Sequence, residues 1–300
     1  MKSLIVCLIV VTACGVTSQD GEDTQASSTQ YVNITDFSAT DQGAWFDAIG
    51  KLNGEFAGAY AGYTPLTFYC SVSSIEGSVK DCAWTFAASN AGVDPTTAAL
   101  SFDVPTFQCH IHPKTTATKL VALLESSSDA IHEPLPGTTS IADALAGCFA
   151  DPIGATPVTE PTDDAPTYVA ASAYYTTAAN RAKWAASYAE LKSGFDSVCG
   201  DTFCSSDYAD LWSMQLECAV TKSTGNLKGC TWAFAGSFTT VATSGALELT
   251  SKAWQCPLAV KGTISQLIAA LTSTTDPNDG VHRVLPGGAI AYDSISGCLP

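Results

Sequence analysis

The chain has 300 residues, with 29 acidic side chains against 13 Lys and Arg, so its formal net charge is −16 at pH 7. A protein this acidic lacks the basic patch that neutralises phosphates, which argues against nucleic acid or an anionic membrane surface as a partner. Segments 19–43 and 151–180 contain acidic residues but no Lys or Arg. Such a surface is explained by solubility.

The N-terminus has the pattern of a secretory signal peptide. A charged start precedes the apolar run Leu4–Val11, which is too short to span a bilayer, and small residues suit cleavage before Gln19. We therefore expect residues 1–18 to be removed and the protein to be secreted into the extracellular space. The alternative is a lipid-anchored bacterial lipoprotein, because the residues around Cys14 resemble a lipobox. We expect no membrane span in the rest of the chain.

Four cysteines and their surroundings occur twice. The gaps between them are 12, 27 and 39 residues in the first set and 12, 26 and 42 in the second. The two sets are Cys70, Cys82, Cys109 and Cys148, and Cys218, Cys230, Cys256 and Cys298. This repeat predicts two tandem homologous modules. The expected divisions are a flexible acidic leader at 19–43, module 1 at 44–150, a linker rich in Pro, Thr and acidic residues at 151–175, and module 2 at 176–300.

Each module is expected to open with an amphipathic helix, because large apolar residues recur at helical spacing. These are Trp45, Ile49, Leu52 and Phe56 in the first module and Trp184, Tyr188, Leu191 and Phe195 in the second.

Three strands and a second helix should follow. Residues 66–73 and 79–88 favour a hairpin that turns at Gly77, and a third strand is expected at about 98–111, with its counterpart at 245–257. Leu120 and Leu124 then mark a second helix. The fold class is therefore α+β, with a helix, about three antiparallel strands and a second helix in each module. This order resembles that of cystatin-like and other small secreted α+β modules, but no motif carries a function over.

The cysteines are expected to form disulfides, because an even number at matched spacing follows a signal peptide. Across a hairpin the first two cysteines of each module lie opposite each other, close enough to bond. The cysteines of an insertion found only in module 2 should bond each other. The predicted bonds are Cys70–Cys82, Cys109–Cys148, Cys199–Cys204, Cys218–Cys230 and Cys256–Cys298.

Two repeated histidines are the main candidates for chemistry. His132 and His282 both precede Leu-Pro-Gly, where a structural role in the turn competes with a catalytic one. Asp143 and Asp293 recur eleven residues later and are expected to face these histidines. No nucleophile recurs in a motif that would complete a triad.

Two further candidate sites occur once each, one in module 1 and one in the leader. His110 and His112 lie on one face of a strand, a geometry that can bind a transition metal, although no third ligand is evident. Asn33 begins the only N-glycosylation sequon, so the protein is a candidate glycoprotein. The repeated Cys82, Trp84 and Phe86 share one strand face and indicate an aromatic core rather than a ligand platform. We expect no cofactor.

The resulting expectation is a non-enzymatic extracellular protein, either a matrix component or a binding protein. Its partner would be an extracellular protein, a glycan or a small ligand. The alternatives are a secreted enzyme of unfamiliar type with its site near His132 or His282, and a carrier of a small apolar ligand in an internal cavity.

Overall fold

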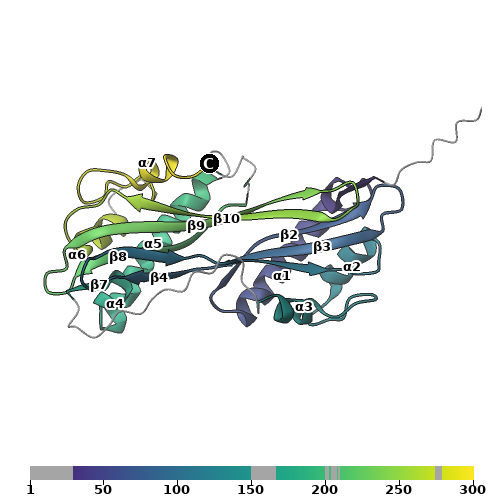
Figure 1. Ribbon diagram of the computed structural model, residues 1–300, viewed down its shortest axis with the longest axis horizontal. Coiled ribbons are helices and arrows are strands. Elements are labelled where there is room, and N and C mark those ends of the chain that lie inside the picture. The colour runs from purple at the N-terminus through teal and green to yellow at the C-terminus, as the bar shows by residue number, and fades with distance from the viewer. Residues whose placement is uncertain (1–29, 150–166, 200–202, 204–207, 209, 274–278) are drawn as a thin grey trace, which may run out of the picture.

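The computed structural model describes residues 30–149, 167–199, 203, 208, 210–273 and 279–300 (Figure 1). Over these residues the chain has a mixed α+β fold with two four-stranded antiparallel sheets. We call the described residues up to 149 the N-terminal half and those from 167 onward the C-terminal half. No helix in the described part of the chain is long and apolar enough to cross a membrane.

The sheet of the N-terminal half has the strand order β1-β2-β3-β6, and a separate ribbon pairs β4 with β5. The helices pack on one face of this sheet. In chain order the elements are β1 (Tyr31–Asn33), the 3-10 turn η1 (Ile34–Asp36), α1 (Gln42–Ala59), β2 (Tyr63–Ser73), β3 (Val79–Ala88), β4 (Asn90–Val93), β5 (Leu100–Asp103), β6 (Thr106–Ile111), α2 (Ala117–Ser126) and α3 (Ile141–Cys148).

The C-terminal half has the same strand order, β7-β8-β9-β10, along the chain. Its ribbon is continuous with its sheet, because β9 and β10 are long enough to form both. The elements are β7 (Tyr168–Ala170), α4 (Ala171–Tyr174), α5 (Ala178–Cys199), β8 (Trp212–Thr221), β9 (Leu227–Val241), β10 (Leu247–Leu258), α6 (Ile264–Leu271) and α7 (Ala291–Ser296).

Local sequence signals explain where these elements begin and turn. The Asp41 carboxylate accepts a hydrogen bond from the Ala44 amide (3.1 Å) and so caps the first turn of α1. Gly77 turns β2 into β3 at φ 65°, and Gly225 turns β8 into β9 at φ 73°. Both lie in the left-handed region, which glycine enters without steric cost. The two predicted hairpins are therefore confirmed, with glycine in each turn.

Alternation along β3 separates the core from the opposite face of the sheet. Cys82, Trp84 and Phe86 are buried against the helices in one aromatic cluster. Phe56 of α1 contacts both rings, at centroid distances of 5.3 Å to Trp84 and 4.6 Å to Phe86. Trp232 and Phe234 of β9 pack on Phe195 of α5 in the C-terminal half in the same way. The prediction of an aromatic core is confirmed.

Four disulfides join described cysteines, and their pairing agrees with the prediction. Cys70–Cys82 and Cys218–Cys230 cross the first hairpin of each half. Cys109–Cys148 and Cys256–Cys298 attach the last strand of each sheet to the segment near the end of each half. The predicted Cys199–Cys204 bond includes a residue outside the described ones, so it stays a prediction.

A short edge strand begins each half, in ranges predicted as leader and linker. β1 pairs with Ser71–Ser73 and β7 pairs with Ala219–Thr221. Residues 31–36 and 168–174 therefore carry regular secondary structure. A strand of three residues is too short to show period-two alternation, although Tyr-Val begins both strands.

The third strand differs from the prediction in one half only. The range 98–111 contains two strands, β5 and β6, with Val104 and Pro105 between them. Proline lacks an amide hydrogen and interrupts a ladder. Its counterpart β10 is continuous, as expected.

The two sheets pack against each other through the faces that do not carry helices. Ala83, Thr85 and Ala87 of β3 point to this face and are fully buried. Thr85 shares a hydrogen bond with Ser237 of β9 (2.8 Å), whose backbone and side chain also donate to Asp210 (3.2 and 2.7 Å). Side chains from two packed sheets share the layer between them. Small side chains such as Ala83 and Ala87 therefore let the two sheets approach closely.

Each half also extends its ribbon along the other half (Figure 1). Gln108 of β6 donates to the Leu249 carbonyl (3.3 Å), and Gln255 of β10 donates to the Phe102 carbonyl (3.3 Å). The two glutamines each precede a matched cysteine, so the two contacts are reciprocal. Each half therefore donates a hydrogen bond to a backbone carbonyl of the other half through one of these glutamines.

Candidate functional site

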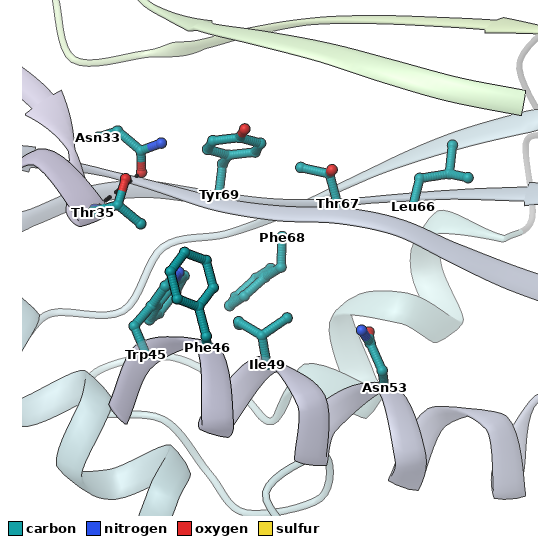
Figure 2. A pocket seen from close by; sticks show the side chains of 10 residues that line it. All are labelled: Asn33, Thr35, Trp45, Phe46, Ile49, Asn53, Leu66, Thr67, Phe68 and Tyr69. Atoms are coloured by element: carbon teal, nitrogen blue, oxygen red, sulfur yellow. Dashed lines mark hydrogen bonds between the residues drawn. The ribbon is translucent and has the colours of Figure 1, made fainter. Parts of the chain in front are cut away.

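A groove lies between α1 and the edge of β2 in the N-terminal half (Figure 2). Its volume is about 240 Å³. β1 pairs only with the end of β2, so no described strand lies beside Leu66–Tyr69 on this side. The lining residues are Asn33, Thr35, Trp45, Phe46, Ile49, Asn53, Leu66, Thr67, Phe68 and Tyr69.

Aromatic and aliphatic side chains from the helix and the strand form the apolar part of the groove. Trp45 stacks on Phe68 at a centroid distance of 5.7 Å and is buried. Phe46, the next residue on α1, is 62% exposed and lies at the mouth of the groove. Trp45, Phe46 and Ile49 all rise from α1 toward β2 (Figure 2). A flat, partly apolar ligand matches such a lining.

Polar groups lie at the ends of the groove. The Asn33 side-chain oxygen accepts a hydrogen bond from the Thr35 amide (3.4 Å). At the other end the side-chain oxygen of Asn53 is covered but has no hydrogen-bond partner among the described residues. An acceptor left in this state costs about 1–3 kcal/mol.

Two carboxylates act on Tyr69, one of the residues that line the groove. Burial raises the pKa of the Tyr69 phenol, and the charges of Asp210 and Asp36 raise it further. The same charges disfavour an anionic ligand and favour a neutral or cationic one.

The corresponding space in the C-terminal half is filled by the protein itself. Counted from the matched tryptophans and cysteines, Tyr188 stands in place of Ile49, and Ser213 in place of Pro65. The Tyr188 hydroxyl bonds the Ser213 hydroxyl (3.0 Å). Lys192, in place of Asn53, lies over the Trp212 ring at 5.3 Å. At the matched positions of the N-terminal half, Ile49 and Asn53 instead line the groove.

A buried glutamate anchors the edge strand of the C-terminal half. Glu217, in place of Tyr69, accepts hydrogen bonds from the Ser172 hydroxyl (2.6 Å) and from the Cys218 amide (3.0 Å). Burial raises the pKa of its carboxyl group, and these hydrogen bonds oppose the rise. We interpret Glu217 as structural, because its oxygens are used in holding α4 to β8.

The repeated histidines bond a carboxylate of their own turn rather than the predicted one. His132 Nδ1 lies 2.8 Å from Asp129, and His282 Nδ1 lies 3.0 Å from Asp279. These aspartates precede the histidines by three residues in both halves. The shared Asp-x-x-His spacing was visible in the sequence and could have identified them.

The expectation that Asp143 and Asp293 face these histidines is wrong for Asp143 and has no support for Asp293. Asp143 forms a capping box with Ser140 at the start of α3, accepting from its amide (3.2 Å) and its hydroxyl (2.7 Å). A helix-capping carboxylate is held by its own turn. Asp293 lies in the first turn of α7, where an acidic side chain favours the helix dipole. Among the described residues, no hydrogen bond or ion pair joins His132 to Asp143 or His282 to Asp293.

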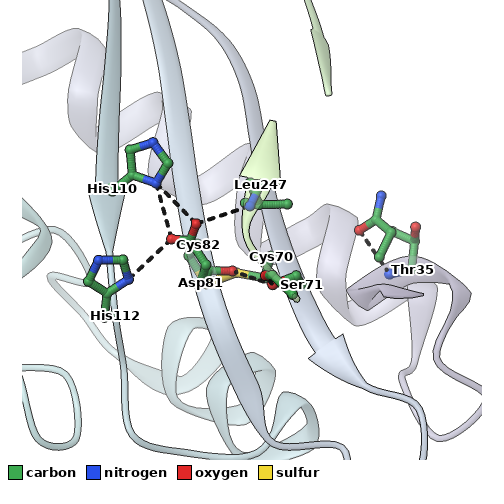
Figure 3. Close-up of a disulfide and its surroundings, with 10 residues drawn as sticks. Thr35, Cys70, Ser71, Asp81, Cys82, His110, His112 and Leu247 are labelled. Carbon is green, nitrogen blue, oxygen red and sulfur yellow. Dashed lines mark hydrogen bonds and ion pairs between the residues drawn. A yellow bond between two sulfur atoms is a disulfide. The ribbon is translucent and has the colours of Figure 1, made fainter. Parts of the chain in front are cut away.

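His110 and His112 flank a buried carboxylate that the sequence analysis did not single out (Figure 3). Asp81, only 8% exposed, lies 3.1 Å from His110 Nδ1 and 3.2 Å from His112 Nδ1. It also accepts a hydrogen bond from the Leu247 amide at the tip of the β9–β10 hairpin (3.2 Å). Among the described residues, no group of three or more His, Cys, Asp and Glu side chains is arranged to hold a metal ion. The cluster joins the two halves.

The predicted glycosylation site lies beside the groove. Asn33 ends β1 and is half-buried, and its sequon partner Thr35 also lines the groove. Modification of Asn33 stays a prediction, and a glycan carried there would stand at this end of the groove.

Comparison with known proteins leaves the site to be interpreted from its own geometry. A scan against protein-family models and searches of curated proteins and of solved structures found no match.

Proposed function

We propose that this chain is a secreted, non-enzymatic binding protein that holds a small ligand in the groove of its N-terminal half. The observation that carries this proposal is the difference between the two halves. Ile49 and Asn53 line a groove beside β2, whereas at the matched positions beside β8 Tyr188 bonds Ser213 and Lys192 lies over Trp212. Because the two halves differ at these positions, we interpret the groove beside β2 as a binding site.

Secretion is supported by the cysteines and the N-terminal pattern. Four disulfides join matched positions, and such bonds persist in oxidising compartments. The apolar run Leu4–Val11 supplies the expected signal. A matrix role remains compatible with the same features, and so does lipid anchoring at Cys14, but neither uses the groove.

The geometry gives less support to the alternative functions. A catalytic role for His132 or His282 requires a second reacting group nearby, and each ring instead bonds an aspartate of its own turn. A carrier of an apolar ligand requires an enclosed cavity of several hundred Å³, whereas the groove measures about 240 Å³ and lies at a sheet edge.

We also infer that the two halves are homologous modules that arose by duplication. Support comes from the matched disulfides, the identical strand order and the reciprocal contacts of Gln108 and Gln255. In this interpretation the open groove is a feature that one copy has and the other lacks.

A fragment screen observed by NMR tests the proposed function. Hits in the groove should lose affinity about tenfold or more in Phe46→Ala, because the exposed ring is removed from the mouth of the groove. Val284→Ala is the matched control, since Val284 is an exposed apolar residue (58%) in the other half. Hits whose affinity is unchanged by Phe46→Ala would contradict the proposal.

A further inference from the structure

One end of the groove combines accessible aromatic rings with nearby negative charge. Phe46 rises from α1 at the same end of the groove as Thr35 and Tyr69 (Figure 2). Phe46 is largely exposed and Tyr69 is half-buried, so both rings present surface to a ligand. The face of an aromatic ring carries partial negative charge and attracts a cation.

The first of two carboxylates at this end belongs to Asp36. It directly follows the lining residue Thr35 in η1 and is exposed. Within the described residues it forms no salt bridge with Lys, Arg or His. Its charge is therefore available to attract a cationic ligand.

The second carboxylate reaches the wall of the groove from the C-terminal half. Asp210 accepts a hydrogen bond from the hydroxyl of Thr67, which lines the groove. The backbone and the hydroxyl of Ser237 donate to the same carboxylate (3.2 and 2.7 Å). No salt bridge neutralises Asp210 in the described part of the chain. Because its oxygens already accept these hydrogen bonds, Asp210 acts on the groove mainly through its charge.

Tyr69 shows that both charges act at this end of the groove. Burial raises the pKa of its phenol, and the charges of Asp210 and Asp36 raise it further. Among the described residues that line the groove, none is Lys or Arg, so no basic side chain of the lining offsets these charges. A cation bound beside Tyr69 would be stabilised by both carboxylates while it contacts aromatic rings.

We propose that this end of the groove binds a small alkylated ammonium ion, with its alkyl groups against Phe46 and Tyr69 and its charge compensated by Asp36 and Asp210. The proposal rests on the proposed function, because it names the ligand class of the same groove. A primary ammonium carries three N–H donors that need acceptors, and a calcium or magnesium ion needs several oxygen ligands. An alkylated ammonium needs neither, so it suits a lining of rings better.

Titration of the full chain with three ligands of similar shape tests this inference. Choline carries a trimethylammonium group, 3,3-dimethylbutan-1-ol is its uncharged carbon analogue, and 3,3-dimethylbutanoate is an anion. Choline should bind about tenfold more tightly than the alcohol, because only choline gains the attraction of the rings and the carboxylates. The anion should bind more weakly than the alcohol. Added NaCl should weaken the binding of choline and leave that of the alcohol unchanged, because salt screens exposed charges.

Two substitutions locate the effect. Asp36→Ser removes one charge and should weaken choline about threefold while leaving the alcohol unchanged. Phe46→Leu keeps an apolar side chain but removes the ring, so it should weaken choline about threefold or more and change the alcohol less. Glu133→Gln is the matched control and should change neither affinity, since it removes an exposed carboxylate from a turn that does not line the groove.

The outcomes separate this inference from the proposed function. Equal affinity for choline and the alcohol, both lost in Phe46→Ala, would overturn the cation and keep the groove as a binding site. Neutral fragments that bind where choline does not would have the same meaning. Tighter binding of choline that Asp36→Ser, Phe46→Leu and salt all leave unchanged would also overturn the inference. A groove that binds no fragment of any class would overturn both.

Discussion

The groove beside β2 and the filled space beside β8 are built on the same frame and differ in a few side chains. In both halves a short edge strand leaves the middle of the next strand uncovered. The C-terminal half covers that edge with Tyr188 and Lys192, whereas Ile49 and Asn53 leave it open. The same backbone arrangement accommodates both sets of side chains. The groove therefore depends on the residues at these positions rather than on the fold.

The same contrast holds at the contact between the halves. Asp81, His110 and His112 receive the tip of the β9–β10 hairpin. The matched positions in the other half are Gly229, Pro257 and Ala259, which carry no charge. The reciprocal glutamine contacts are symmetric, but this charged contact exists on one side only.

Removal of a long-range disulfide should have the largest effect and should be equal in the two halves. Two double variants open loops of 39 and 42 residues, namely Cys109→Ala with Cys148→Ala and Cys256→Ala with Cys298→Ala. Each pair should lower the free energy of unfolding by about 2–4 kcal/mol, because loops of similar length restrict the unfolded chain similarly. Urea denaturation measures both. A loss in one half more than twice that in the other would show that the frames are not equivalent.

The buried hydroxyl of Ser213 should have an intermediate effect. Ser213→Ala leaves the Trp232 indole without its partner and should cost about 1–3 kcal/mol. In the other half, Pro65→Ser should be about 1 kcal/mol more stable than its control Pro65→Ala, because the serine offers Trp84 a partner and both variants lose the proline ring. Equal stability of the two Pro65 variants would show that the Trp84 N–H gains no hydrogen bond from a hydroxyl at position 65.

The smallest effect should be a pH dependence specific to the N-terminal half. The hydrogen bond to Asp81 raises the pKa of His110 above its ordinary value of 6.5, and partial burial opposes the rise. A raised pKa in the folded state stabilises the fold below the unfolded value, and this stabilisation is lost as pH rises through the folded value.

His110→Gln should therefore remove a stabilisation that the parent protein has at about pH 5 and lacks at about pH 8. The effect should stay below about 1 kcal/mol, because the His110 side chain is 37% exposed and solvent screens the pair. The groups facing His110 are Asp81 and His112, and Asp81 also accepts a hydrogen bond from the Leu247 amide. Unfolding at a series of pH values measures the difference, and a parent and variant with parallel pH profiles would contradict it.

Local features were predictable because they depend on residues close in the chain or on a repeated pattern. Alternation on β3 identified the core face of Trp84 and Phe86, and the hairpin geometry identified the partner of Cys70. The edge strands were missed because three residues show no period. The role of Asp143 was misjudged because a shared spacing of eleven residues resembled a contact, whereas the actual partner, Ser140, lies three residues away.

The sequence by itself determined the α+β class, the four bonded cysteine pairs among described residues and the aromatic cores, since hydrophobic period and cysteine spacing specify these locally. Only the tertiary structure decided that Ala83, Thr85 and Ala87 are small because a second sheet lies on them. It also decided that Ile49 and Asn53 of α1 face the uncovered edge of β2, which is where the groove lies. Both depend on packing between elements that lie far apart in the sequence, and a local sequence pattern carries no information about such contacts.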